Sequence, residues 1–184
     1  MAQFYDLTDS NGGKKLKIWE EYPDLFDVTR EAHKKCEVNI THHDFDHALQ
    51  VAVVAGMIAQ DPQSARLAAA AALCHNADRM IEKRHGNKVE EPSQVEVESL
   101  VSSWLQNEPR LSHHERSLIT SAVLEHSKPN CKDDSPIIIV LKDADRVVCL
   151  GLDVIVRGAQ DNGCITIHPR LLLNDKRGRY GRRQ

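Results

Sequence analysis

The sequence predicts an all-α domain, and three observations support this prediction. Aromatic residues make up only 4% of the chain, and alanine, valine, leucine and isoleucine supply most of its apolar residues. Five consecutive alanines occupy positions 68–72, and alanine has the highest helix propensity of all amino acids. Apolar residues also recur at intervals of three and four in several segments, which is the spacing of one buried helix face. Packed helices fit these features better than a small β-barrel does.

Length and charge describe one domain of ordinary composition. The chain has 184 residues, enough to bury one hydrophobic core. We expect a loose start at residues 1–13, a single helical domain at 14–168 and a basic, flexible tail at 169–184. The net charge of −3 lacks the basic excess of a dedicated nucleic-acid-binding protein. Nucleic acid is therefore not expected as the main partner.

The cysteines and the apolar runs bear on where the protein is found. Its five cysteines are odd in number and include no Cys-x-x-Cys pair, so neither a disulfide framework nor a thiolate zinc site is predicted. No apolar run approaches the roughly 20 residues that span a bilayer, and the N-terminus lacks a basic-then-apolar signal segment. We therefore expect a cytoplasmic protein that does not associate with a membrane.

Start and stop signals place most of the expected helices. Asp44 is suited to be an N-cap, Pro92 can open a helix, and Ser112 forms a capping box with Glu115. The expected helices span residues 14–21, 23–38, 44–60, 63–76, 93–107 and 112–127, and the polar residues 80–92 are expected to form a loop. One buried face of the second helix is expected to consist of Leu25, Val28, Ala32 and Cys36.

The apolar run at residues 137–141 is compatible with a buried strand or a buried helix, because short apolar runs fit both periods. Its context favours the helix. Pro136 follows Ser135 and suits the first position of a helix. Helical spacing then continues through Leu141, Ala144, Asp145, Val148 and Leu152. We therefore expect one long helix that carries Asp145.

Several polar positions fall on or near the apolar faces of separate expected helices. They are His47, His75 with its neighbour Asn76, His126 and Asp145. A single inward histidine is more often a hydrogen-bonded core residue than a ligand, but three histidines with an aspartate favour a metal site. Imidazole and carboxylate ligands suit one divalent ion such as Mn, Fe, Co, Ni or Zn, which lowers the pKa of bound water toward ~7.

Three segments occur in a specific order and helical context. They are Thr41-His42-His43-Asp44-Phe45-Asp46-His47, Ala72-Leu73-Cys74-His75-Asn76 and Lys142-Asp143-Ala144-Asp145-Arg146. Together they resemble the HD-domain superfamily of phosphohydrolases, over roughly residues 25–160. The sequence is most similar to a poorly characterised bacterial-type branch, in which the late aspartate segment leads into a glycine and an arginine, here Gly151 and Arg157.

The resemblance implies an all-α bundle of five or more helices that holds one divalent metal ion and acts on small phosphorylated substrates, often nucleotides. The metal ligands that it implies are His47, His75, Asn76 and Asp145. His126 matches an inner histidine that some members use beside the metal, for substrate phosphate or a second ion. Arg79, one turn after His75, matches a basic residue that can pair with a phosphate oxygen. Arg79 and His126 are therefore the catalytic candidates.

Asn76 is the largest departure from the family pattern, because its amide oxygen is neutral where the usual aspartate is charged. Loss of a residue that only supports a metal ligand typically costs ~10- to 100-fold in metal affinity or activity, so the loss of a ligand's own charge should cost at least as much. Asp78 lies about 200° further around an ideal helix, so it can replace the missing ligand only where the helix unwinds. Two functions stay open: a phosphohydrolase weakened by Asn76, and a degenerate member that binds nucleotide or a protein partner without hydrolysis.

Other branches and chemistries fit the sequence less well. Residues 90–94 contain no histidine where dinuclear branches supply further ligands, so one metal ion is expected. Hydrolases of guanosine tetraphosphate have a Glu-Asp pair after the His-Asp doublet that corresponds to His75-Asn76, and this pair is also absent. The chain has no Gly-rich phosphate loop, His-Glu-x-x-His segment or Gly-x-Ser-x-Gly segment, which argues against nucleophilic serine chemistry.

Overall fold

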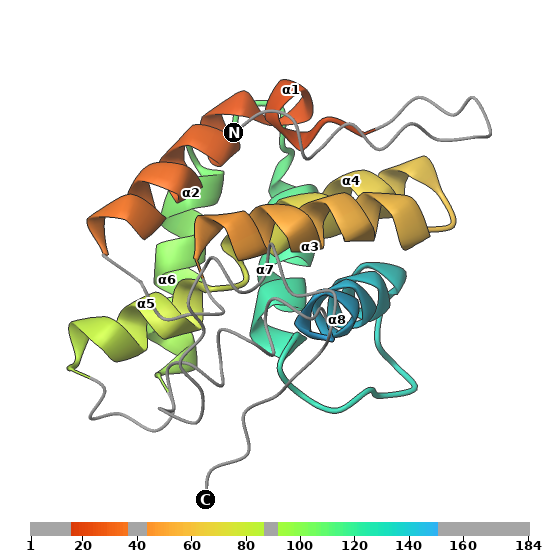
Figure 1. Ribbon diagram of the computed structural model, residues 1–184. Helices are drawn as coiled ribbons and strands as arrows, with labels where there is room; N and C mark the ends of the chain where they lie inside the picture. Colours follow the sequence, from red (N-terminus) through yellow and green to blue (C-terminus); the bar gives the residue numbers. More distant parts are fainter. Residues whose placement is uncertain (1–15, 37–43, 87–91, 151–184) are drawn as a thin grey trace, which may run out of the picture.

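The computed structural model describes residues 16–36, 44–86 and 92–150 (Figure 1). Within these ranges the chain forms eight helices and no strand, so the predicted all-α fold is confirmed. The helices are α1 (Ile18–Glu21), α2 (Pro23–Lys35), α3 (Phe45–Ile58), α4 (Pro62–Cys74), α5 (Ala77–Arg84), α6 (Gln94–Leu105), α7 (His113–Glu125) and α8 (Pro136–Cys149).

Two helices that lie side by side, α3 and α4, form the centre of the bundle (Figure 1). The alanines at 68–72 are completely buried, and their small side chains let the neighbouring helices approach α4 closely. Helix α8 packs against both α3 and α4, and α7 packs against α4. As a result, residues from α3, from the end of α4 and from α8 can meet inside one domain.

Side-chain caps fix where several helices begin. The side chain of Asp44 accepts a backbone N–H of α3 at 2.8 Å, as predicted. Ser112 and Glu115 form the predicted capping box at the start of α7. Pro92, in contrast, does not open α6, because the N-cap position belongs to Ser93. Each confirmed cap satisfies a backbone N–H that has no partner within its own helix.

The apolar run at 137–141, which fits a strand or a helix by its sequence, is helical and belongs to α8. Ser135 is its N-cap, and the Ser135 hydroxyl accepts the N–H of Ile138 at 3.4 Å. Pro136 occupies the first turn, where its missing N–H costs no hydrogen bond. Asp145 therefore lies well inside a 14-residue helix, as the spacing predicts.

The prediction of a loop at residues 80–92 is wrong for residues 80–84, because α5 continues through Arg84. The segment is polar overall, but Ala77, Met80 and Ile81 are buried and lie three and four residues apart. This spacing is that of an amphipathic helix, and the charged residues between these positions, Asp78 and Arg79, are only partly buried. Residues 87–91 lie outside the described part of the chain.

The buried face of α2 also differs from the expected one. The most buried residues of the helix are Leu25, Thr29 and His33, whereas Val28, Ala32 and Cys36 are only half-buried. Thr29 tolerates burial because its hydroxyl donates to the carbonyl of Leu25 at 2.8 Å. His33 tolerates it because Nδ1 donates to the carbonyl of Thr29 at 2.8 Å. Two polar residues therefore belong to a face that the apolar pattern assigns to other positions.

Among the helices that the structure describes, none has the length and apolar character needed to cross a membrane. The loose start expected at residues 1–13 and the basic tail expected at 169–184 lie outside the described residues. The same is true of Gly151 and Arg157, which belong to the resemblance.

Candidate metal centre

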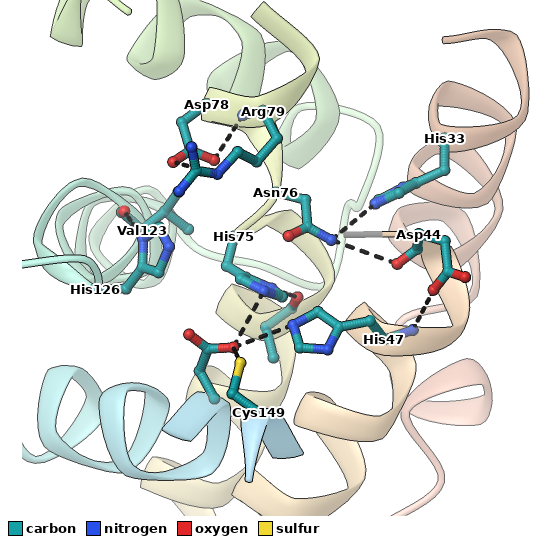
Figure 2. A network of polar contacts seen from close by, with 12 residues as sticks. His33, Asp44, His47, His75, Asn76, Asp78, Arg79, Val123, His126 and Cys149 are labelled. Atoms are coloured by element: carbon teal, nitrogen blue, oxygen red, sulfur yellow. Dashed lines mark hydrogen bonds and ion pairs between the residues drawn. The ribbon is translucent and has the colours of Figure 1, made fainter. Parts of the chain in front are cut away.

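Three of the predicted ligands come together from three helices: His47 of α3, His75 at the end of α4 and Asp145 of α8. Figure 2 shows the rings of His47 and His75 next to each other. One potential ligand atom from each residue lies within 4.8 Å of the others. The Nε2 atoms of His47 and His75 are 3.1 and 3.7 Å from Asp145 Oδ1. Two ligands of one transition-metal ion lie about 3 to 3.5 Å apart, given bonds of about 2.1 Å. Both distances to Asp145 are thus close to the spacing that a shared ion requires.

The ring of His75 is oriented by the end of its own helix. Nδ1 donates to the carbonyl of Ala72 at 2.6 Å, so the lone pair of the neutral ring is on Nε2. This Nε2 is buried and has no hydrogen-bond partner among the described residues. An imidazole held at one nitrogen by a carbonyl and open at the other is the usual arrangement of a metal-binding histidine. The residues present therefore fit a divalent metal ion.

The charge states of the centre suit metal binding as well. Burial lowers the pKa of His75, and the neighbouring His126 lowers it further, so the ring stays neutral. Burial alone would raise the pKa of Asp145, but the hydrogen bond with His47 and the nearby imidazole rings outweigh it and hold the pKa well below its usual range. A neutral imidazole and an ionised carboxylate are the forms that bind metal without first losing a proton.

His126, one of the two catalytic candidates, lies beside this group but outside it. It is the C-cap residue of α7, and its ring meets that of His75 edge to face with centroids 5.4 Å apart. Its Nδ1 donates to the carbonyl of Val123 at 2.6 Å, which leaves Nε2 for another partner. The structure therefore places His126 at the edge of the centre, half-buried, next to a predicted ligand.

Arg79, the other catalytic candidate, is held by two carboxylates of its own helix. Its Nη1 is 2.9 Å from Glu82 Oε1, and its Nε is 3.8 Å from Asp78 Oδ2. The helix does break between α4 and α5, which is the condition for Asp78 to turn inward. Asp78 instead accepts the backbone N–H of Arg79 at 2.7 Å and does not join the group of three. Asp78 therefore does not replace the missing aspartate.

Asn76 follows His75 at the junction between α4 and α5 and is almost completely buried. Its Nδ2 lies 3.3 Å from His33 Nε2 and 3.4 Å from the carbonyl oxygen of Asp44. Figure 2 shows the amide nitrogen on the side of these two residues and the amide oxygen on the opposite side. Whether this oxygen is a metal ligand remains a prediction.

Two residues that contact predicted ligands are absent from the sequence prediction. They are His33, which contacts Asn76, and Cys149, which contacts Asp145. The position of His33 follows from the i, i+4, i+8 spacing of Leu25, Thr29 and His33, which could have indicated a shared face. Cys149 lies one turn after Asp145, and its Sγ is 3.6 Å from Asp145 Oδ1. Burial, followed by the charge of Asp145, raises the pKa of this thiol to about 11. Cys149 is therefore a neutral thiol that contacts a predicted ligand.

The fold and the site define this class of protein as a helical domain with a candidate metal centre. In this centre, His47 of α3 and His75 at the end of α4 face the carboxylate of Asp145 on α8. The HD domain family matches residues 44–148, which is more than half of the 184-residue chain and includes all four predicted ligands. The chain belongs to the HD domain family, and the predicted resemblance is confirmed at that level. Neither a curated protein nor a solved structure matches the chain. The bacterial-type branch stays a prediction.

Proposed function

We propose that the protein is a metal-dependent phosphohydrolase that acts on a nucleotide or another small phosphate ester. The observation that carries this proposal is the buried Nε2 of His75, which has no hydrogen-bond partner among the described residues. A buried polar atom without a partner is costly, typically by about 1–3 kcal/mol, so a bound ligand is the simplest explanation for it. The neighbouring His47 and Asp145 make that ligand a cation.

The ion would be held by His47, His75 and Asp145, with the amide oxygen of Asn76 as a fourth, neutral ligand. Nitrogen and oxygen ligands in this ratio suit a divalent Mn, Fe, Co, Ni or Zn ion. When bound, such an ion acidifies water and polarises phosphoryl oxygens. The low pKa of Asp145 keeps one full negative charge at the site over the whole physiological pH range.

Arg79 and His126 are the residues that would bind the substrate phosphate. The side chain of Arg79 is 40% exposed, so its guanidinium can reach a ligand while Asp78 and Glu82 hold its orientation. His126 directs Nε2 away from its own helix because Nδ1 is bound to Val123. A planar guanidinium is a suitable donor for phosphate oxygens, and Nε2 of His126 donates to such an oxygen when the ring carries a second proton, because Nδ1 already holds one.

A second candidate function is favoured by one observation, the neutral side chain at position 76. A degenerate member would keep the fold and bind a nucleotide or a protein partner without hydrolysing it. The two candidates agree on the fold but differ on turnover. Metal content and turnover must therefore be measured on the same samples.

The test combines elemental analysis of the purified protein with a screen of phosphate esters in the presence of added Mn, Co or Ni. We expect His47→Ala and Asp145→Ala to lose both the metal and the turnover. His114→Ala and Asp143→Ala are the matched controls, because His114 is exposed on α7 and the Asp143 side chain on α8 pairs with Arg146 and does not belong to the group of three. Both controls should keep the metal and the activity.

The outcomes separate the candidates. Turnover in the unmodified protein that disappears with His47 or Asp145 supports the phosphohydrolase. Binding of nucleotide without turnover, with every metal tested, favours the degenerate member. Full activity in His47→Ala and Asp145→Ala would show that this centre does not carry the reaction.

A further inference from the structure

The carboxamide of Asn76 lies in a small polar cage formed by the side chain of His33 and the backbone carbonyl of Asp44. Nδ2 of Asn76 is 3.3 Å from His33 Nε2 and 3.4 Å from the Asp44 oxygen (Figure 2). Asn76 is 1% exposed and His33 is 5% exposed, so water does not compete freely for these contacts. The cage joins α2, the start of α3 and the junction between α4 and α5.

Both cage atoms are acceptors, and this fixes which end of the carboxamide faces them. His33 Nδ1 lies 2.8 Å from the carbonyl oxygen of Thr29, which can only accept, so Nδ1 carries the proton and Nε2 carries the lone pair. The Asp44 atom is a carbonyl oxygen. Only the NH₂ group of Asn76 can satisfy both, so the amide oxygen is held on the opposite side.

The cage is rigid because its members are fixed by other contacts. Thr29 is fully buried, and its hydroxyl donates to the carbonyls of Leu25 and Phe26 at 2.8 and 3.1 Å. The ring of Phe45 meets the ring of His33 edge to face, with centroids 5.5 Å apart. His33 therefore cannot easily turn away from Asn76, and the orientation of the carboxamide is set before any ligand binds.

We infer that this cage is matched to a neutral carboxamide. We also infer that His33 is a positioning residue, which directs the oxygen of Asn76 toward the metal centre. The inference rests on the proposed function, since it assigns the neutral oxygen to the proposed metal ion. An aspartate at position 76 would place an oxygen, which only accepts, against two other acceptors. Asn76 is then the residue that this cage requires, and its substitution by aspartate disturbs the fold instead of repairing a defect.

The first experiment measures stability without metal, in the full chain with a chelator present. The variants are Asn76→Asp, His33→Gln and the double variant, because a glutamine amide can present either an acceptor or a donor to position 76. We expect Asn76→Asp to lower the thermal midpoint by about 5–10 °C, from the loss of two buried hydrogen bonds. His33→Gln should lower it by less, and the double variant should recover at least half of the loss caused by aspartate.

His114→Gln is the matched control for the histidine change, since His114 is exposed on α7. It should leave the midpoint of both the wild-type protein and Asn76→Asp unchanged. An Asn76→Asp protein as stable as the wild type would overturn the inference. So would a double variant whose loss is the sum of the two single losses.

The second experiment measures Co²⁺ affinity by titration, followed by the absorption of the bound ion. If His33 acts through Asn76, His33→Ala weakens affinity about 10-fold in the wild-type protein and has no further effect in an Asn76→Ala background. If the role of His33 is purely structural, His33→Ala weakens Co²⁺ affinity equally in both backgrounds. That result would overturn the inference.

The two proposals fail in distinguishable ways. Bound Co²⁺ with equal effects of His33→Ala in both backgrounds overturns the role of His33 and leaves the proposed function in place. A wild-type protein that binds none of the candidate metals overturns the proposed function and, with it, the direction assigned to the Asn76 oxygen. The stability measurements then still decide whether the cage is matched to a neutral carboxamide.

Discussion

His75 and His126 end two different helices in the same way, and their rings meet edge to face with centroids 5.4 Å apart. Each is a C-cap residue whose Nδ1 donates to the carbonyl three residues earlier at 2.6 Å. The last carbonyls of a helix lack donors within the helix, so one hydrogen bond satisfies the helix end and orients the ring. In both residues, Nε2 is the nitrogen left for a metal ion or a substrate.

The positions of these two rings predict different roles. His75 belongs to the group of three potential ligands, whereas His126 does not. We therefore expect His126→Ala to keep its bound metal and to lose turnover by about 100-fold, the effect of removing one donor from a developing negative charge. The measurement is kcat together with metal content on the same protein preparation.

The control for this variant is His114→Ala, which removes an exposed histidine near the other end of α7. It should change neither kcat nor metal content. If His126→Ala instead loses the metal in proportion to its activity, His126 is a ligand, and the division between the two histidines is wrong.

Bound metal should also stabilise the fold, because the ligands come from three helices that pack together. A ligand at about 100 times its Kd adds about 2.7 kcal/mol to the free energy of unfolding, which raises the thermal midpoint of a protein of this size by about 5–10 °C. We expect this rise for the wild-type protein and for Asp143→Ala, and its reversal by a chelator. An equal rise in Asp145→Ala would mean that the metal binds elsewhere.

Most of the helices, and the helical positions of His47 and Asp145, could be predicted from the sequence because their signals are local. Ser135 and Pro136 mark the start of α8 whatever the rest of the chain does, and the helical spacing then places Asp145 on its inner face. His47 follows in the same way from the Asp44 cap. Local signals therefore predicted α3 and α8, two of the three helices that meet at the candidate metal centre.

The contacts of Asn76 could not be predicted, because they depend on how α2 packs against the rest of the bundle. His33 is 43 residues away from Asn76 in the sequence, and its own side of α2 contains the polar Thr29. An apolar pattern assigns such positions to the surface, whereas the structure buries them by satisfying their hydrogen bonds internally. The same limit applies to α5, whose buried Met80 and Ile81 lie within a polar segment.

Arg79 offers a test of substrate binding that is separate from metal binding. Its guanidinium is half-buried and held by Asp78 and Glu82, so a substrate phosphate would meet a donor that is already oriented. We expect Arg79→Ala to lower kcat/KM by about 10- to 100-fold, the value of hydrogen bonds to a charged group, with no change in metal content. The measurement is steady-state kinetics on the substrate that the phosphatase screen identifies.

Lysine at position 79 keeps the charge but not the planar pair of donors, so Arg79→Lys should recover only part of the loss. Arg84→Ala removes an arginine from the other end of α5 and is the matched control. An Arg79→Ala enzyme with unchanged kcat/KM would show that Asp78 and Glu82 hold this side chain for structural reasons alone.

The segment between α7 and α8 is tied to the bundle by Lys142, a lysine that is 1% exposed. Its ammonium donates to Asp134 Oδ2 at 2.7 Å and to the carbonyl of Pro129 at 3.0 Å. The same Asp134 oxygen accepts the N–H of Cys131 at 2.9 Å. The carboxylate of Asp134 therefore pairs with the buried ammonium of Lys142 and also accepts the backbone N–H of Cys131.

These contacts make the stability of the fold depend on pH. The hydrogen bond from the Cys131 N–H, followed by that from Lys142, lowers the pKa of Asp134 below its ordinary value of 3.8. Because the folded pKa is the lower one, the stabilisation is complete above the unfolded value and is lost as the pH falls through the folded value. We expect Asp134→Asn to be less stable than the wild type in urea at pH 7, and the difference to shrink steadily below about pH 4. Asp133→Asn, an exposed neighbour, should show no such dependence. A difference that stays constant down to pH 2 would mean that the charge of Asp134 does not stabilise the fold.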